Sequence, residues 1–162
     1  MAGDAADAPA FETEVRQRSV VKGHAETTRL AKQYLRAAYT DDDGVLYCQV
    51  CHDRMLFKVN GHWYFEVIQF VPKRAKSHHQ NALALCPLCA ALYIYTRETC
   101  DNALVANLRD EEIGSDTSRV DVPVILNGKR EAIWFTGKHA LDLKTVLGTA
   151  GAARDDSPEE EA

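Results

Sequence analysis

The sequence has no apolar run long enough to cross a bilayer, which takes about 20 consecutive apolar residues. The first seven residues also lack the basic start and the apolar stretch of a secretory signal. We therefore expect a cytoplasmic protein with no membrane partner. Thiols stay reduced in the cytoplasm, so paired cysteines there indicate metal or redox chemistry rather than disulfides.

The chain also lacks the strong positive charge that marks a dedicated nucleic-acid binder. Its 162 residues carry a net charge of −5, but residues 1–14 and 152–162 are both acidic. Without these ends the remaining segment carries about +3. We expect disordered acidic tails over 1–14 and 151–162, because neither can bury enough apolar surface to fold. A single domain is expected over 15–150.

Hydrophobic periodicity predicts the elements of the N-terminal half. A helix is expected from about Ala25 to Tyr39, with Leu30 and other apolar residues on one stripe. An acidic loop over 40–44 ends it. Two strands over 55–59 and 63–71 should then form a hairpin around Asn60-Gly61, because both residues tolerate the positive φ of a type I′ turn.

The same kinds of signal predict the elements of the C-terminal half. Pro72 ends the strand, residues 73–79 form a polar loop, and a strand over 82–85 leads into a helix beginning near Pro87. A second hairpin is expected from strands over 120–126 and 131–135, around a turn at 127–130. A last helix should run from Lys138 to Leu147 and stop at Gly148.

Two Cys-x-x-Cys pairs, separated by 34 residues, are the most specific signal in the sequence. A two-residue spacer lets one tight turn offer two thiolates, and two such turns complete the tetrahedron that Zn²⁺ requires. We predict one structural zinc ion, held by Cys48, Cys51, Cys86 and Cys89. Such a shell leaves no open position for a catalytic water, and its binding can contribute roughly 10–16 kcal/mol to folding.

Two other readings of these cysteines carry less weight. A pair of disulfides is disfavoured by the expected compartment, and a thioredoxin-like redox role requires only one pair. His52 follows the first pair directly, and we expect it to be exposed or to support the site. Cys100 stands alone, and its default role is that of a small buried apolar residue.

The segment from Cys48 to about Tyr95 resembles the zinc-bearing HNH endonucleases, the ββα-metal nucleases. The resemblance rests on the first Cys-x-x-Cys pair, on Glu66-Val67-Ile68-Gln69-Phe70-Val71-Pro72, and on His79-Gln80-Asn81-Ala82-Leu83-Ala84-Leu85-Cys86-Pro87-Leu88-Cys89. It covers about a third of the chain. It implies a zinc-knuckle ββα core over 45–97. Together with the N-terminal helix and the hairpin plus helix expected over 118–148, this core predicts an α+β fold.

The resemblance does not extend to the catalytic residues of the family. Family members carry an acidic residue or histidine and then the general-base histidine where Ile68 and Gln69 stand, and a metal-holding histidine where Ala90 stands. Glutamine accepts no proton at neutral pH, and losing a general base costs about 10²–10⁴ in rate. Asn81 is retained, and in the family it orients the loop and the base.

Histidines elsewhere offer a substitute chemistry. His78 and His79 lie together in the loop, with His62 on the hairpin, and could recruit a cation or activate water. The simpler interpretation is that His78 and His79 are exposed loop residues, because no carboxylate accompanies the pair. His139 and Asp142 share one face of the last helix, where capping and solubility explain them.

Three functions therefore compete. The chain is expected to be a zinc-stabilised, non-catalytic HNH-like module that binds nucleic acid or a protein partner, and no small-molecule substrate is indicated. Nucleic-acid contacts are expected from a basic loop and the neighbouring hairpin, namely Lys73, Arg74, Lys76, Arg54 and Lys58.

The alternative is an active metal-dependent endonuclease with relocated histidines, His78 and His79. Similar zinc modules are attached to large ATPase-like proteins of bacterial defence systems, which implies a larger protein partner.

Overall fold

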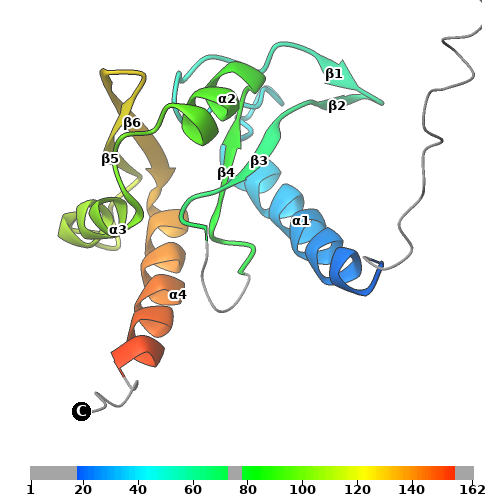
Figure 1. Cartoon of the computed structure of the whole chain (residues 1–162). Coiled ribbons are helices and arrows are strands. Elements are labelled where there is room, and N and C mark those ends of the chain that lie inside the picture. Colours follow the sequence, from blue (N-terminus) through cyan, green and yellow to red (C-terminus); the bar gives the residue numbers. More distant parts are fainter. Residues whose placement is uncertain (1–17, 73–77, 156–162) are drawn as a thin grey trace, which may run out of the picture.

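The computed structural model describes residues 18–72 and 78–155. Within these residues the fold is mixed α+β, with four helices and three two-stranded antiparallel sheets (Figure 1). No helix in the described ranges is long and apolar enough to cross a membrane. The elements follow in the order α1 (Arg18–Tyr39), β1 (Lys58–Val59), β2 (His62–Trp63), β3 (Glu66–Gln69), β4 (Ala82–Leu85), α2 (Pro87–Tyr95), α3 (Asp101–Asp110), β5 (Arg119–Leu126), β6 (Lys129–Thr136) and α4 (Gly137–Asp155).

Helix α1 ends at Tyr39 as predicted but begins at Arg18, earlier than the sequence pattern indicates. Its buried residues Ala31, Leu35 and Tyr39 recur every four positions, which places them on one face of the helix. Leu30 lies at the margin of this face, with 36% of its surface exposed. The buried face packs against β3 and β4.

The first hairpin turns at Asn60-Gly61, where both residues have positive φ, 53° and 81°, as a type I′ turn requires. The prediction of one strand over 63–71 is wrong. The chain divides after Trp63 into β2, which pairs with β1, and β3, which pairs with β4. Phe65 is buried at the division, so the chain passes there from an exposed hairpin into the core and changes its pairing partner.

Strands β3 and β4 and helix α2 form a compact unit. All four residues of β4 are buried, and the antiparallel register places Glu66 opposite Leu85 and Gln69 opposite Ala82. Helix α2 follows directly, with Pro87 in its first turn as predicted. Because α1 and α2 both pack against the two strands, this strand–strand–helix segment lies at the centre of the fold.

The second hairpin is longer than predicted, because Lys129 and Arg130 belong to β6 rather than to the turn. Asn127 and Gly128 form the turn with φ of 50° and 73°. Alternate residues of β5 are buried, in a strict exposed–buried pattern, so one face of the hairpin contributes to the core.

Two helices depart from the sequence analysis. Helix α4 continues to Asp155, so the predicted stop at Gly148 is wrong, and the tail expected over 151–162 overlaps the helix. A glycine inside a helix costs only about 1 kcal/mol relative to alanine, which is too little to end one. Helix α3 is not predicted at all, although Leu104 and Leu108, four residues apart, are both buried.

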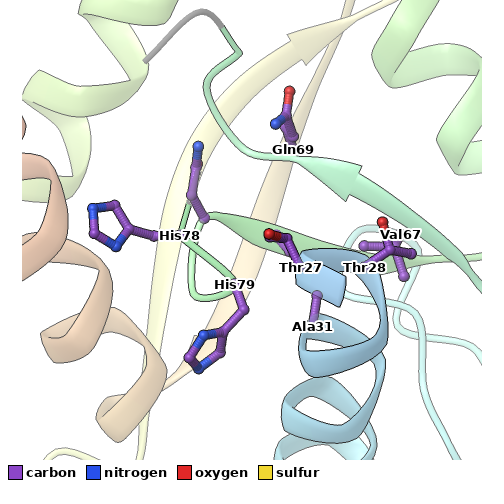
Figure 2. Close-up of a pocket in the computed structure, with 9 residues that line it drawn as sticks. Thr27, Thr28, Ala31, Val67, Gln69, His78 and His79 are labelled. Carbon is purple, nitrogen blue, oxygen red and sulfur yellow. The ribbon is translucent and has the colours of Figure 1, made fainter. Parts of the chain in front are cut away.

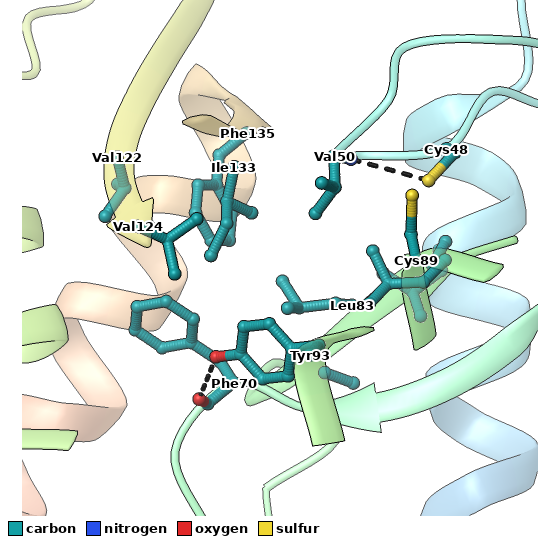
Figure 3. Packing of buried hydrophobic residues seen from close by; sticks show 14 of the residues in the cluster. Cys48, Val50, Phe70, Leu83, Cys89, Tyr93, Val122, Val124, Ile133 and Phe135 are labelled. Atoms are coloured by element: carbon teal, nitrogen blue, oxygen red, sulfur yellow. Dashed lines mark hydrogen bonds between the residues drawn. The ribbon is translucent and has the colours of Figure 1, made fainter. Parts of the chain in front are cut away.

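One cluster of buried side chains connects the elements. Figure 3 shows Phe70 and Tyr93 of the central segment close to Val122, Ile133 and Phe135 of the second hairpin. The rings of Phe70 and Phe135 meet edge to face, with centroids 5.5 Å apart. The segment over 45–97 and the C-terminal hairpin therefore share one core. The division into one domain over 15–150 and two tails stays a prediction, since residues 1–17 and 156–162 lie outside the described ranges.

The start of α4 supplies a test of this packing. A Cβ atom added at Gly137 would lie 1.9 Å from the backbone oxygen of Thr117, whereas one added at Gly148 would have no neighbour within 4 Å. We expect Gly137→Ala to lower the free energy of unfolding by about 1–3 kcal/mol, because backbone must move. Gly148→Ala, on the same helix, should be neutral or stabilising by up to about 1 kcal/mol. Urea denaturation of both variants measures this, and equal stabilities would contradict the contact.

Candidate metal centre

The two cysteine pairs meet in the structure. The Sγ atoms of Cys48, Cys51, Cys86 and Cys89 all lie within 4.8 Å of one another. Among the described residues this is the one group of three or more histidine, cysteine or acidic side chains close enough to hold a metal ion. No disulfide joins these cysteines. The predicted convergence of the two pairs is therefore confirmed.

Each pair is presented by a tight backbone turn. In the first, the N–H of His52 donates to the carbonyl of Cys48, and His52 adopts a positive φ of 66°. In the second, Cys86 caps the N-terminus of α2, and its sulfur accepts a hydrogen bond from the N–H of Cys89 at 3.4 Å. A turn and a helix start thus place two sulfurs each on the same side of the backbone.

Backbone N–H groups also point at the sulfur of Cys48. The amides of Val50 and Cys86 donate to it at 3.5 and 3.4 Å, and the first of these bonds is drawn in Figure 3. Such bonds favour the charged form of the acceptor, so they favour a thiolate at this position. The bond from Cys86 also ties the two turns together.

The four thiols cannot all ionise by themselves. A hydrogen bond from the Cys89 thiol, aided by the backbone donors, lowers the pKa of Cys48 to about 5. Burial raises the pKa of Cys51 to about 12, and the bond that Cys89 donates to Cys48 raises the pKa of Cys89 above its ordinary range. Like charges this close disfavour each other. A divalent cation among the sulfurs removes that conflict and displaces the remaining protons.

The donor set fits a tetrahedral metal ion. Sulfurs at about 2.3 Å from a central ion lie about 3.8 Å apart, and the Sγ atoms of Cys51 and Cys86 are 4.0 Å apart. Cys48, Cys86 and Cys89 are buried, and only Cys51 is exposed. Four thiolates fill the coordination shell, so an ion held here stabilises the fold and has no position free for substrate.

Gln49, inside the first turn, connects this site to the rest of the core. It is fully buried, and its backbone and side chain both bond to Ala84 of β4. Its Nε2 donates to the carbonyl of Trp134 and to the hydroxyl of Tyr39, at 2.9 and 3.0 Å. The turn is thereby fixed to α1, β4 and β6. Sequence analysis misses Gln49, because glutamine between two cysteines carries no pattern that indicates burial.

The Tyr39 hydroxyl extends this network to α4. It donates to Nδ1 of His139 at 2.6 Å, and Nε2–H of His139 donates to the carbonyl of Gln80 at 2.8 Å. His139 is fully buried, so its assignment to capping and solubility is wrong. Its neighbour on that face, Asp142, accepts hydrogen bonds from Tyr34 and Lys138. The rings of Tyr34, Tyr39 and Phe135 all pack against His139, with centroids 5.1 to 5.7 Å from its own.

The positions that match HNH catalytic residues hold no proton acceptor. Ile68 and Gln69 lie on β3, and both line a groove of about 380 Å³ beside Tyr93 and Ile94. Ala90 is buried in α2. No histidine or carboxylate lines this groove among the described residues.

Asn81 is buried and acts as a clamp for the loop. Its Oδ1 accepts from the N–H of Val71 at 3.0 Å, and its Nδ2 donates to the carbonyl of the same residue at 2.8 Å. The bonds join the two ends of the segment between β3 and β4. Asn81 therefore fixes the start of β4 to the chain just after β3.

The two candidate histidines line a different, smaller cavity, together with Gln69 and Asn81 (Figure 2). Figure 2 shows both imidazole rings directed away from the Gln69 side chain. His79 packs edge-on against Tyr34, with ring centroids 5.4 Å apart. No carboxylate lines this cavity within the described part of the chain.

The remaining predicted residues divide into two groups. Arg54 and Lys58 are exposed beside and on the first hairpin, whereas Lys73, Arg74 and Lys76 lie outside the described residues. His52 is exposed, as expected. Cys100 is exposed at the N-terminus of α3, so its prediction as a buried residue is wrong.

Comparison with known proteins adds no further constraint. The chain matches no protein-family profile, no curated protein sequence and no solved structure. The resemblance to HNH nucleases therefore rests on the sequence motifs alone.

Metal content tests the four-cysteine site. We expect one divalent metal ion per purified chain, measured by plasma mass spectrometry. Cys89→Ser should lose the ion and unfold at lower temperature, because a three-thiolate site binds less tightly and the binding energy is folding energy. Cys100→Ser is the matched control, since that thiol is exposed and outside the cluster, and it should keep the metal. Full metal content in Cys89→Ser would contradict the site.

The buried histidine predicts a pH dependence. Burial lowers the pKa of His139 to about 4, whereas an unfolded histidine titrates near 6.5. The unfolded chain therefore takes up a proton first, and stability should fall by about 3 kcal/mol as the pH drops from 6.5 to 4. His139→Gln should flatten this slope in urea unfolding. Acid also releases metal from thiolates, but it does so in both proteins, so their difference isolates His139.

The same prediction has a readout that requires no variant. Nuclear magnetic resonance of the His139 ring in the unmodified chain should show no titration above about pH 5. A midpoint near 6.5 would contradict its burial as a neutral ring.

Proposed function

We propose that the chain is a zinc-stabilised, non-catalytic module that binds nucleic acid through the surface of its first hairpin. The hairpin surface comprises Arg54, Phe57, Lys58 and His62. One observation carries the proposal: this surface combines exposed cations that have no acidic partner within the described part of the chain with an exposed aromatic ring, Phe57, stacked on Tyr64. The zinc, the lack of catalysis and the ligand are argued in turn.

Zinc is proposed because the donor set is soft. Four thiolates in a tetrahedral arrangement select Zn²⁺ or iron among the common metals. Zinc needs no redox partner and suits a purely structural site. Zinc rather than iron would leave the protein colourless. Reduced thiols also fit a cytoplasmic location, which remains part of this proposal.

The absence of catalysis is proposed from the groove beside β3. An HNH nuclease requires a base and a divalent ion at the scissile phosphate. Ile68 and Ala90 offer no ligand atom, and Gln69 is not a base at neutral pH. The strand–strand–helix order supports an HNH-like scaffold, but the side chains of this groove do not support the reaction.

The hairpin surface supports nucleic acid as the ligand. Arg54 and Lys58 form no ion pair among the described residues, whereas four other cations do. Phe57 stacks on Tyr64, with ring centroids 5.1 Å apart and planes within 10°, and remains 47% exposed. Unpaired cations bind phosphates, and exposed aromatic rings stack on unpaired bases. The combination favours a single-stranded ligand.

Salt-dependent binding tests this proposal. We expect the chain to bind a labelled single-stranded oligonucleotide at about 50 mM salt, with affinity falling as salt rises. Arg54→Ala/Lys58→Ala should weaken binding at least tenfold and reduce the slope of log K against log salt by roughly 1.4, for two lost phosphate contacts. Fluorescence anisotropy measures both quantities.

Lys129→Ala/Arg130→Ala is the matched control. It removes two exposed charges from the end of the other hairpin, on the opposite side of the view in Figure 1, and should bind like the unmodified chain. Equal losses of affinity in the two double variants would mean that binding depends on net charge and not on the hairpin surface. No binding by the unmodified chain at low salt would end the nucleic-acid proposal.

The alternative function is a metal-dependent endonuclease that uses His78 and His79. One observation favours it: burial lowers the pKa of His79, so its ring is neutral at pH 7 and can ligate a cation or accept a proton. Addition of Mg²⁺ or Mn²⁺ and plasmid DNA to the same mixtures tests it. Nicking that disappears in His78→Ala/His79→Ala would replace the non-catalytic proposal.

A protein partner is the second candidate for a binding module. Helix α2 exposes three apolar side chains, Leu88, Ile94 and Tyr95, with 66%, 56% and 83% of their surfaces accessible. Neighbouring exposed apolar residues are typical of surfaces that another protein covers. If oligonucleotides do not bind, isolation of the chain from its native host with its partner becomes the decisive experiment.

A further inference from the structure

A small cavity lies between the C-terminal part of α1 and the first hairpin. It has a volume of about 170 Å³, and its lining includes Arg36 and Thr40 at the end of α1 with Lys58, His62 and Trp63 of the hairpin. The indole N–H of Trp63 donates to the carbonyl of Gly44 at 2.8 Å. This bond fixes one wall of the cavity. None of the sequence motifs points to this place, because its residues come from three separate elements.

Arg36 carries the one buried side-chain nitrogen or oxygen atom without a hydrogen-bond partner among the described residues. Its guanidinium lies over the ring of Phe65, 5.3 Å from the centroid, and its Nε atom is buried with no hydrogen-bond acceptor among the described residues. A buried donor without an acceptor is destabilising. Arg36 also lines the cavity and contributes a positive charge to it.

The second cation in the lining is Lys58 of β1. Its Nζ atom lies over the ring of Trp63, 4.9 Å from the centroid. Neither Arg36 nor Lys58 takes part in the four ion pairs of the described residues. Two unpaired cations that line one cavity repel each other unless an anion lies between them.

Nearby carboxylates do not supply that anion. Asp41 lies in the loop after α1, but its oxygens accept from the N–H groups of Asp43 and Val45 and from the hydroxyl of Tyr47. No acidic side chain of the described residues lines the cavity. Its lining therefore carries the cations Arg36 and Lys58 without a carboxylate.

We propose that this cavity binds one phosphate group. The volume is below the roughly 300–1,000 Å³ of ordinary small-molecule sites, so it admits a single group rather than a whole nucleotide. Donors from α1, β1 and β2 surround it. A phosphate presents three acceptor oxygens in different directions, whereas a carboxylate offers two in one plane. The proposal rests on the proposed function, because it assigns to nucleic acid the group that enters the cavity.

Trp63 reports occupancy without any substitution. We expect its fluorescence to change saturably with inorganic phosphate, and not with potassium chloride or acetate at equal ionic strength. Trp63→Phe identifies the contribution of the other tryptophan, Trp134. An equal response to all three salts, or no response to phosphate, would overturn the proposal. An equal response to acetate and phosphate, without a response to chloride, would indicate a carboxylate site instead and would also overturn it.

A matched pair of helix variants locates the site. Arg36→Met removes the cavity cation and keeps an apolar stem against Phe65, whereas Lys32→Met removes an exposed charge one turn earlier on α1. Arg36→Met should weaken phosphate binding at least tenfold, the loss of one charge-assisted hydrogen bond of about 1.5–3 kcal/mol. Lys32→Met should not. Equal affinities in the two variants would place the phosphate elsewhere.

Oligonucleotides distinguish the sources of the phosphate and separate this inference from the proposed function. Tighter binding of a 5′-phosphorylated strand than of the same strand with a 5′-hydroxyl, lost in Arg36→Met, assigns the cavity to a terminal phosphate. Equal binding of the two strands that weakens in Arg36→Met assigns it to an internal phosphodiester. Binding of both strands that is insensitive to Arg36→Met would overturn the inference and leave the proposed function intact. Saturable phosphate binding with no oligonucleotide binding would support the phosphate cavity and overturn the proposed function.

Discussion

The structure depends on the requirement that four sulfurs lie within 4.8 Å of one another. Two short turns, 34 residues apart in the sequence, must approach closely for this to happen. Four thiols in so small a space cannot all lose their protons without a cation, because the thiolates repel one another. A divalent metal ion bound among them would attract all four. The segment between the turns contains the first hairpin and the central strands β3 and β4, so their position follows from the position of the sulfurs. Much of the binding free energy of the ion is therefore folding free energy.

A network of buried hydrogen bonds connects the cysteine site to the remaining elements. Gln49 lies between the cysteines of the first turn and bonds to β4 and β6, and the hydroxyl of Tyr39 links it to His139 of α4. Buried polar groups are tolerated where every donor finds an acceptor, and this chain of contacts meets that condition. It also specifies one arrangement, because a shifted helix would leave several groups unpaired. The site and the C-terminal half thus depend on each other.

The sequence predicts what is encoded locally. Cysteine spacing identifies the four sulfurs that converge, Asn-Gly pairs identify both hairpin turns, and Pro87 marks the start of α2. Partner choice is not local: residues 63–71 read as one strand, but burial of Phe65 divides them between two sheets. Buried polar residues such as Gln49 and His139 resemble surface residues in a sequence, because their partners lie 10 to more than 80 residues away. The cavity beside Arg36 is not visible to sequence analysis for the same reason, because its lining comes from α1, the loop after it and the first hairpin.

X-ray absorption at the zinc edge of the purified, reduced protein is the most direct test of the central claim. The account predicts four sulfur scatterers at about 2.3 Å and no nitrogen or oxygen neighbour in the first shell. A mixed shell, fewer sulfurs, or a protein that keeps its fold with no metal bound would contradict it. The first two results would mean that the four cysteines do not act together. The third would mean that the packing of the core, rather than the ion, holds the two turns in place.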